Sequence, residues 1–161
     1  MTPTSSRIPF GLAALLCVTL ITGTLSQRLS PDPLPAVYTP GASLLTEAEA
    51  AGFPLLSPES ARSLHQAGSH LFLDARSLDE YHQGHIPGAF PVPVNAFDLH
   101  FPDIAPILMP DSPLIAYCGN PACDQALRLA ERLRDAGYTN VSLFPAGYDA
   151  WSTMNAEETR P

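Results

Sequence analysis

The sequence predicts an α/β domain with a mainly parallel central sheet flanked by helices. Three short apolar runs are typical of buried strands, and segments with helical patterns separate them. Strands that alternate with helices favour a parallel sheet with short right-handed crossovers. The three runs are LFLDA (71–75), LIAYC (114–118) and VSLF (141–144).

Helix signals fill the intervals between these runs. Residues 57–68 begin with Ser57 as an N-cap and Pro58 at the first helical position, and residues 77–84 form a short helix closed by Gly84. The segment 123–138 is amphipathic, with Gly137 as a natural cap. The remaining expected elements are a second short strand within 85–94, a helical turn near 95–101, and a last helix opened by 145–151 that carries Trp151 as a core residue.

Length and charge restrict the possible functions. The chain has 161 residues, which suits one domain plus an appendage, and its formal net charge is −8. All eight basic Lys and Arg side chains are arginines. No basic stripe is present that could displace counterions from a nucleic acid, so we expect no nucleic-acid partner.

The N-terminal segment predicts export. Residues 8–25 carry no charge and are long enough for a marginal membrane span, although they also resemble a long signal-peptide core. We favour an uncleaved membrane anchor over a cleaved signal peptide, which would give a secreted protein, and over an internal hydrophobic segment. In the first two cases the domain lies outside the cytoplasm, in the periplasm or its equivalent. The predicted organisation is an anchor or signal peptide (1–28), a Pro-rich tether (29–56), the domain (57–155) and a short tail (156–161).

Cys118 is the strongest candidate for chemistry. It ends a predicted buried strand, and the turn-prone GNPA (119–122) and the amphipathic helix follow it. Free N–H groups of such a loop and the positive end of a helix dipole both favour a thiolate, which is the nucleophilic form. Ligands of parallel α/β folds gather at the carboxyl ends of strands, where Cys118 is expected to lie. A buried structural cysteine is the alternative.

With these residues in hand, the chain resembles the rhodanese-like (sulfurtransferase) family over residues 57–152. The resemblance rests on LFLDARSLDEYHQGHIPGA (71–89), on the strand that delivers Cys118, and on YTNVSLFPAGYDAW (138–151), in which Ala146 stands where a glycine pair is usual. It implies a three-layer fold and a Cys118 that takes a sulfane sulfur from a small-molecule donor such as thiosulfate. The resulting persulfide would pass its sulfur to a thiol acceptor, which could be a protein thiol. No cofactor is implied.

The loop after Cys118 departs from the family pattern. It is about two residues longer than usual by comparison with the family, and no arginine lies between Cys118 and Arg128. The run CGNPAC resembles a subset of exported or membrane-associated rhodanese-like domains with a second cysteine. A phosphatase of the related Cys-x5-Arg type is disfavoured, because Asp124 occupies the position of its arginine.

Backbone N–H groups of the loop are expected to ring the sulfur and stabilise its negative charge. The N–H groups of this ring belong to Gly119, Asn120, Ala122 and Cys123. The predicted substrate-binding residues are Gly119, Asn120, Ala122 and Asp124. Cys123 has two readings: it resolves a Cys118 persulfide or closes a disulfide with it, or it fills the first helical turn. A metal site is disfavoured because two thiols without a nearby His pair fall short of four ligands.

The predicted supporting residues are Asp74, Arg76, Glu80 and His85. Arg76 and Glu80 are four apart and are expected to pair, whereas Asp74 either orients the loop or caps the helix at 77–84. His85 is expected to be structural rather than a base. The leading function is therefore an exported, membrane-tethered sulfurtransferase. The alternatives are a thiol–disulfide module that uses Cys118 and Cys123, and a non-catalytic interaction domain with the same fold.

Overall fold

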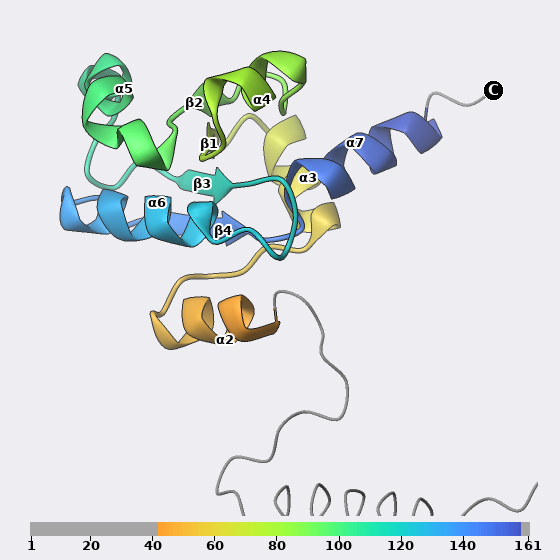
Figure 1. The fold of residues 1–161 in the computed structure, drawn as a ribbon, viewed down its shortest axis with the longest axis horizontal. Coiled ribbons are helices and arrows are strands. Elements are labelled where there is room, and N and C mark those ends of the chain that lie inside the picture. Colours follow the sequence, from red (N-terminus) through yellow and green to blue (C-terminus); the bar gives the residue numbers. More distant parts are fainter. Residues whose placement is uncertain (1–41, 159–161) are drawn as a thin grey trace, which may run out of the picture. The chain divides into compact units, whose positions relative to one another are not determined.

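A computed structural model describes residues 42–158 of the chain, which form an α/β sandwich around four strands (Figure 1). The first helix precedes the region in which the sequence predicts the domain, and the other elements follow the predicted order. In chain order the elements are α2 (Ala42–Ala50), α3 (Pro58–Gln66), β1 (Leu71–Asp74), α4 (Leu78–Gln83), β2 (Phe90–Pro91), η1 (Val94–Ala96), α5 (Phe97–Ile104), η2 (Ala105–Ile107), β3 (Leu114–Tyr117), α6 (Gln125–Asp135), β4 (Val141–Phe144) and α7 (Gly147–Glu158).

The sheet is parallel throughout, which confirms the predicted fold class. Its strand order is β2-β1-β3-β4, so β1 and β3 are central and pair with each other in register from Leu71↔Leu114 to Asp74↔Tyr117. Neighbouring parallel strands end at the same edge of a sheet. The residues that follow β1 and the residues that follow β3 therefore meet at one edge, which is where Cys118 lies.

Side-chain alternation along the strands builds two hydrophobic cores, one on each face of the sheet. Leu114 and Ala116 face a core shared with α2, α5 and α6, whereas Ile115 and Tyr117 face a core shared with α3 and α7. Figure 1 shows α6 running beside β4, and α3 beside α7. Continuing this alternation by one residue turns Cys118 toward the face covered by α2 and α6, and Cys118 belongs to that core.

The helix start signals are realised as predicted at α3. The Ser57 side chain accepts a hydrogen bond from the N–H of Ser60, and Pro58 occupies the first helical turn. At α4 the cap is Ser77, not Asp74: Ser77 accepts from the N–H of Glu80, and the Glu80 carboxylate accepts from the N–H of Ser77. This reciprocal capping box satisfies two N–H groups that the helix itself leaves free. The alternative that Asp74 caps this helix is therefore corrected.

The packed residues begin earlier than the predicted domain boundary at residue 57. Helix α2 and the segment after it contribute Ala48 and Phe53 to the core, and Leu55 forms an isolated parallel bridge with Leu143 of β4. The part of the predicted tether from residue 42 onward is thus folded with the domain. Leu44, Leu45 and Ala48 have helical spacing, but the sequence does not show what this short helix packs against.

The predicted anchor lies outside the described residues. Among residues 42–158, no helix has the length and apolar character needed to cross a bilayer.

Candidate active site

Cys118 follows the last residue of β3 directly, at the carboxyl edge of the sheet. Only 3% of the residue is exposed, because Leu127 of α6 and Leu143 of β4 belong to the same core. The position agrees with the sequence prediction of a cysteine at a strand end.

That loop returns to Cys118 through a disulfide bond with Cys123. The two Cα atoms are 6.2 Å apart, within the span that a disulfide bridges. Cys123 is half-buried, so it is the more exposed of the two residues. Two roles were predicted for Cys123, and the structure agrees with the one in which it forms a disulfide with Cys118.

Gln125, the first residue of α6, reaches both sulfurs. Its Oε1 lies 3.4 Å from Sγ of Cys118 and 3.6 Å from Sγ of Cys123. In the reduced protein each thiol can donate to this oxygen, and a turn of the amide would present Nε2 to a thiolate. The sequence prediction missed Gln125. The available signal was its position: Gln125 is a polar residue in the first turn of the helix that follows the cysteine loop, where side chains lie close to the loop.

The beginning of α7 holds the loop from the other side. The N–H of Tyr148 donates to the carbonyl of Cys118 at 2.8 Å, and the N–H of Asp149 donates to the carbonyl of Gly119 at 2.9 Å. Gly147 precedes them with φ +65°, and a Cβ there would lie 2.7 Å from the Gly119 carbonyl oxygen. Glycine is therefore required at 147 both for the left-handed backbone and for the close approach of the loop.

Two of the four predicted N–H donors bond within this disulfide-bonded loop instead of pointing to the sulfur. Asn120 takes two of the donors: the N–H of Ala122 donates to its Oδ1 at 3.0 Å, and the N–H of Cys123 donates to its backbone carbonyl at 3.1 Å. Asn120 thus builds a local turn, which is a common role for this residue. The expectation that Ala122 and Cys123 stabilise the sulfur with their N–H groups is corrected for this form of the loop.

Asp74 and Arg76 form a buried pair beside the site. Nη2 of Arg76 lies 2.6 Å from Oδ2 of Asp74 and also donates to the carbonyl of Gly84. Burial disfavours the guanidinium charge, but the hydrogen bond and charge of Asp74 outweigh it, so the pKa of Arg76 is raised. The predicted Arg76–Glu80 pair is wrong, because Glu80 bonds Ser77 in the capping box. The backbone turn after β1 brings Asp74 closer to Arg76 than the helix brings Glu80.

This pair supports the loop indirectly. The Arg76 guanidinium lies over the Tyr148 ring at 4.5 Å, and Tyr148 is the residue whose N–H holds the carbonyl of Cys118. Beneath it, the buried Tyr117 accepts a hydrogen bond from the N–H of Ile86 at 3.2 Å. Burial, with the neighbouring Asp74 charge, raises the pKa of Tyr117 far above its ordinary value. Tyr117 is therefore a neutral structural group and supplies no charge to the site.

The other predicted site residues have local roles. His85 stacks on the Tyr81 ring with centroids 3.8 Å apart, and its Nδ1 lies 2.9 Å from the Tyr81 carbonyl. These contacts fit the structural role expected for it. Asp124 is exposed at the N-cap position of α6, with no hydrogen bond from its side chain to the helix. Within residues 42–158, no group of three or more His, Cys, Asp or Glu side chains is placed to hold a metal ion.

Two hollows flank the cysteine loop. A small one of about 30 Å³ separates the disulfide from α2, where Leu44, Leu45 and Ala48 face Pro121. A larger one of about 350 Å³ opens on the other side of Gln125, between the residues after β1 and β2. Its polar lining residues are Ser77, Asp79, Asn95, His100 and Gln125. Both cysteines line the small hollow, whereas the larger one approaches them only through Gln125.

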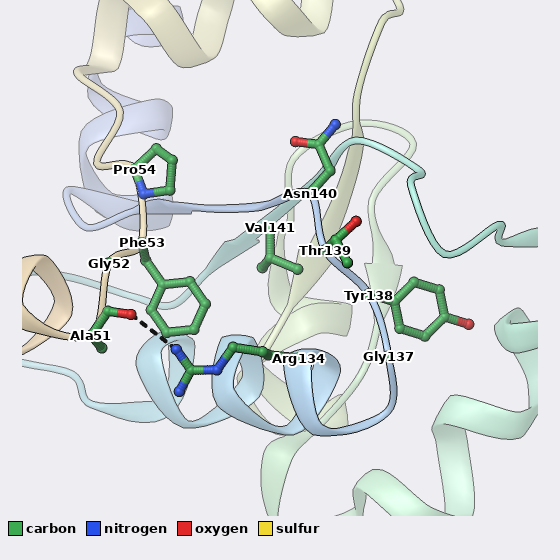
Figure 2. A pocket seen from close by; sticks show the side chains of 10 residues that line it. All are labelled: Ala51, Gly52, Phe53, Pro54, Arg134, Gly137, Tyr138, Thr139, Asn140 and Val141. Atoms are coloured by element: carbon green, nitrogen blue, oxygen red, sulfur yellow. Dashed lines mark hydrogen bonds between the residues drawn. The ribbon is translucent and has the colours of Figure 1, made fainter.

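A third hollow lies away from the cysteines (Figure 2). It has a volume of about 440 Å³ and is lined by the segment after α2, the end of α6 and the start of β4. Figure 2 shows Nη1 of Arg134 bonded to the carbonyl of Ala51, and the guanidinium lies over the Phe53 ring at 4.6 Å. Val141 opens β4, so this groove is at the amino edge of the sheet. Its arginine is already paired and fastens the α2 segment to α6.

Comparisons with known proteins identify the class to which this fold and site belong. The Rhodanese-like domain family model matches residues 57–154. The chain therefore belongs to the rhodanese-like family. Comparison with curated proteins gives no match.

Several solved structures are similar to the described domain. A thiosulfate sulfurtransferase from Pseudomonas aeruginosa is 27% identical with a TM-score of 0.56, and the match covers 71% of this chain but 21% of that one. The human single-domain sulfurtransferase TSTD1 is 23% identical with a TM-score of 0.53, covering 67% and 98% of the two chains. An uncharacterised protein from Saccharomyces cerevisiae is 22% identical with a TM-score of 0.55, covering 68% and 98%. Family membership supports a general role in sulfur transfer.

Proposed function

We propose that this chain is a single-domain sulfurtransferase that carries a sulfane sulfur as a persulfide on Cys118. The observation that carries the proposal is the placement of Cys118 at the carboxyl end of a central parallel strand in a rhodanese-like domain. The loop carbonyls are held by α7, which keeps the cysteine in one position. The likeness to a thiosulfate sulfurtransferase makes thiosulfate the first donor to test.

In the proposed reaction, the reduced Cys118 thiolate attacks the outer sulfur of thiosulfate. A bond forms between this sulfur and Sγ, and sulfite leaves with the electron pair of the broken S–S bond. The persulfide then gives its outer sulfur to a thiophilic acceptor. Because the thiolate is the attacking species, the disulfide with Cys123 must first be reduced.

The test is an intact-mass measurement on the reduced full chain after incubation with thiosulfate. We expect the Cys123→Ser variant to gain one sulfur atom and the Cys118→Ser variant to gain none. Cyanide should then remove the added sulfur as thiocyanate. If Cys123→Ser takes up no sulfur and produces no thiocyanate, Cys118 is not a persulfide carrier and the domain is left with a non-catalytic interaction role.

A second candidate is a thiol–disulfide module, and the Cys118–Cys123 disulfide is the observation that favours it. Such a module would exchange two electrons with a partner dithiol and would take up no sulfur. The same mass measurement separates the two. A loss of two hydrogens that needs both cysteines, without sulfur uptake by any variant, would identify the redox module.

We also propose that residues 1–28 tether the domain to a membrane and place it outside the cytoplasm. The uncharged run 8–25 is long enough for a marginal membrane span. The Cys118–Cys123 disulfide suits an oxidising compartment. The test is fractionation of cells that express the full chain or a chain lacking residues 1–28. The full chain should stay with membranes after an alkaline wash, and recovery in the soluble fraction would contradict the tether.

A further inference from the structure

The disulfide places Cys123 where it can act on a sulfur carried by Cys118. A persulfide on Cys118 keeps its inner sulfur at the Sγ position, which is the atom bonded to Cys123 in this structure. No rearrangement of the fold is needed to bring the two sulfurs together, since their Cα atoms already have the required separation. Cys123 is bonded to Sγ of Cys118 in this structure, so its attack on the inner sulfur needs no reactant from solution.

Resting on the proposed function, we propose that Cys123 resolves the Cys118 persulfide and that the protein therefore releases sulfide. The Cys123 thiolate attacks Sγ of Cys118, the disulfide forms, and the outer sulfur leaves as hydrosulfide with the electron pair of the broken bond. The sulfane sulfur is reduced by two electrons, and the two cysteines are oxidised by two. Hydrosulfide is a good leaving group because its conjugate acid is more acidic than an ordinary thiol.

The disulfide is then the resting product of each cycle, and a reductant must reopen it. A dithiol supplies the required two electrons. Its first thiol forms a mixed disulfide with the protein, and its second thiol then displaces the protein and closes a disulfide within the reductant. The net reaction converts thiosulfate and a dithiol into sulfite, sulfide and a disulfide. The protein therefore needs two other reactions: one that supplies a sulfane sulfur donor, and a dithiol oxidoreductase that supplies the electrons.

Exposure decides which sulfur the dithiol attacks. Only 3% of Cys118 is exposed, although Cys118 and Cys123 both line the small hollow beneath α2. Cys123 is half-buried and lies farther along the exposed part of the loop. Attack on Cys123 forms the mixed disulfide there and frees Cys118 as the leaving thiolate. Each reduction then regenerates the nucleophile without exposing it.

The first test is a single turnover without cyanide or added thiol. The full chain is reduced, freed of reductant under anaerobic conditions and mixed with one equivalent of thiosulfate. We expect wild type to release one equivalent each of sulfite and sulfide and to lose two hydrogens from its mass. Cys123→Ser should release the same sulfite, keep one added sulfur and release no sulfide. The third cysteine of the sequence is Cys17, within the uncharged run 8–25. Cys17→Ser is the matched control and should behave as wild type.

The outcomes separate this inference from the proposed function. If wild type and Cys123→Ser both keep the added sulfur and neither releases sulfide, Cys118 is a carrier but Cys123 does not resolve it, and the inference is overturned. If Cys123→Ser takes up no sulfur, the proposed function itself fails.

The second test maps the site of reduction. The oxidised chain is mixed with a thioredoxin whose second active-site cysteine is replaced by serine, which traps the mixed disulfide. We expect peptide mapping to find the thioredoxin on Cys123. Trapping on Cys118 would overturn the proposed direction of attack.

Discussion

At the scale of single residues, the site depends on neighbours that hold Cys118 without taking part in the chemistry. Gly147 permits the approach of the loop, and Gln125 contacts both sulfurs. The sequence prediction identified Cys118 because a strand, a turn and a helix are local patterns. It mispaired Arg76 because the choice between Asp74 and Glu80 depends on how the chain turns after β1, which spacing alone does not determine.

Replacing Gln125 by Glu should slow the reaction of Cys118 with thiol reagents. A carboxylate beside the sulfurs repels a thiolate, and a unit charge at this distance changes such rates by about three- to tenfold. The measurement is the iodoacetamide alkylation rate at neutral pH, in a reduced Cys123→Ser background. Gln125→Met is the neutral control. Equal rates for Glu and Met variants would show that charge at this position does not reach Cys118.

Replacing Gly147 by Ala should destabilise the fold more than replacing Gly68. Both glycines have similar positive φ, +65° and +61°, but a Cβ at Gly68 meets no atom within 4 Å whereas one at Gly147 meets the loop carbonyls. The left-handed backbone alone costs an alanine about 1–2 kcal/mol, and we expect Gly147→Ala to exceed that cost. Urea unfolding of both variants measures the difference, and equal losses would contradict the close approach.

At the scale of elements, the helix caps show which features can be predicted from neighbouring residues alone. Ser57 caps α3 as predicted, since the signal lies within four residues. The capping box of α4 was available from the same kind of pattern, Ser77 followed by Glu80, and it explains why Glu80 does not pair with Arg76. Helix α2 is the opposite case, because its packing depends on residues far along the chain.

Ser77→Ala should destabilise the domain by about 1 kcal/mol at neutral pH, the usual effect of losing an N-cap. The side-chain and backbone hydrogen bonds of Ser77 lower the pKa of Glu80 below its ordinary value. A lowered folded pKa gives stability that is present above that value and is lost as the pH falls through the folded pKa. The difference between variant and wild type should therefore shrink in acid.

Urea unfolding at neutral pH and below the folded pKa of Glu80 measures this effect. Ser63→Ala, an exposed position inside α3, is the control and should show neither the loss nor its pH dependence. A Ser77→Ala loss that is the same at both pH values would show that the carboxylate contributes nothing to the cap.

At the scale of the whole molecule, the strand order creates the site. Because β1 and β3 are central and parallel, the Asp74–Arg76 pair and the Cys118 loop emerge at the same edge of the sheet. Helix α7 arrives there from the end of β4 and binds the loop carbonyls. Helix α2 covers the same face as Cys118, although it precedes the segment that the family model matches.

A fragment that begins at residue 57 should therefore be less stable than one that begins at residue 42. It loses the burial of Ala48 and Phe53 and the bridge between Leu55 and Leu143. Loss of a buried phenylalanine alone costs about 3–5 kcal/mol, so we expect a loss of at least that order. Urea unfolding of the two fragments tests this, with Phe53→Ala in the longer fragment as the matched control. Equal midpoints would show that α2 does not contribute to folding.

The sequence by itself determined the order of strands and helices, the parallel sheet, and the placement of Cys118 at a strand end. These features follow from period, caps and turn residues, which act over a few neighbouring positions. Only the tertiary structure decided that Arg76 pairs with Asp74, that Gln125 meets both sulfurs, that Asn120 takes two of the loop donors, and that α2 covers the cysteine face. Each of these contacts joins groups that only the folded chain brings together. Several partners are possible from the sequence, and the packing of the buried groups decides which of them makes the contact.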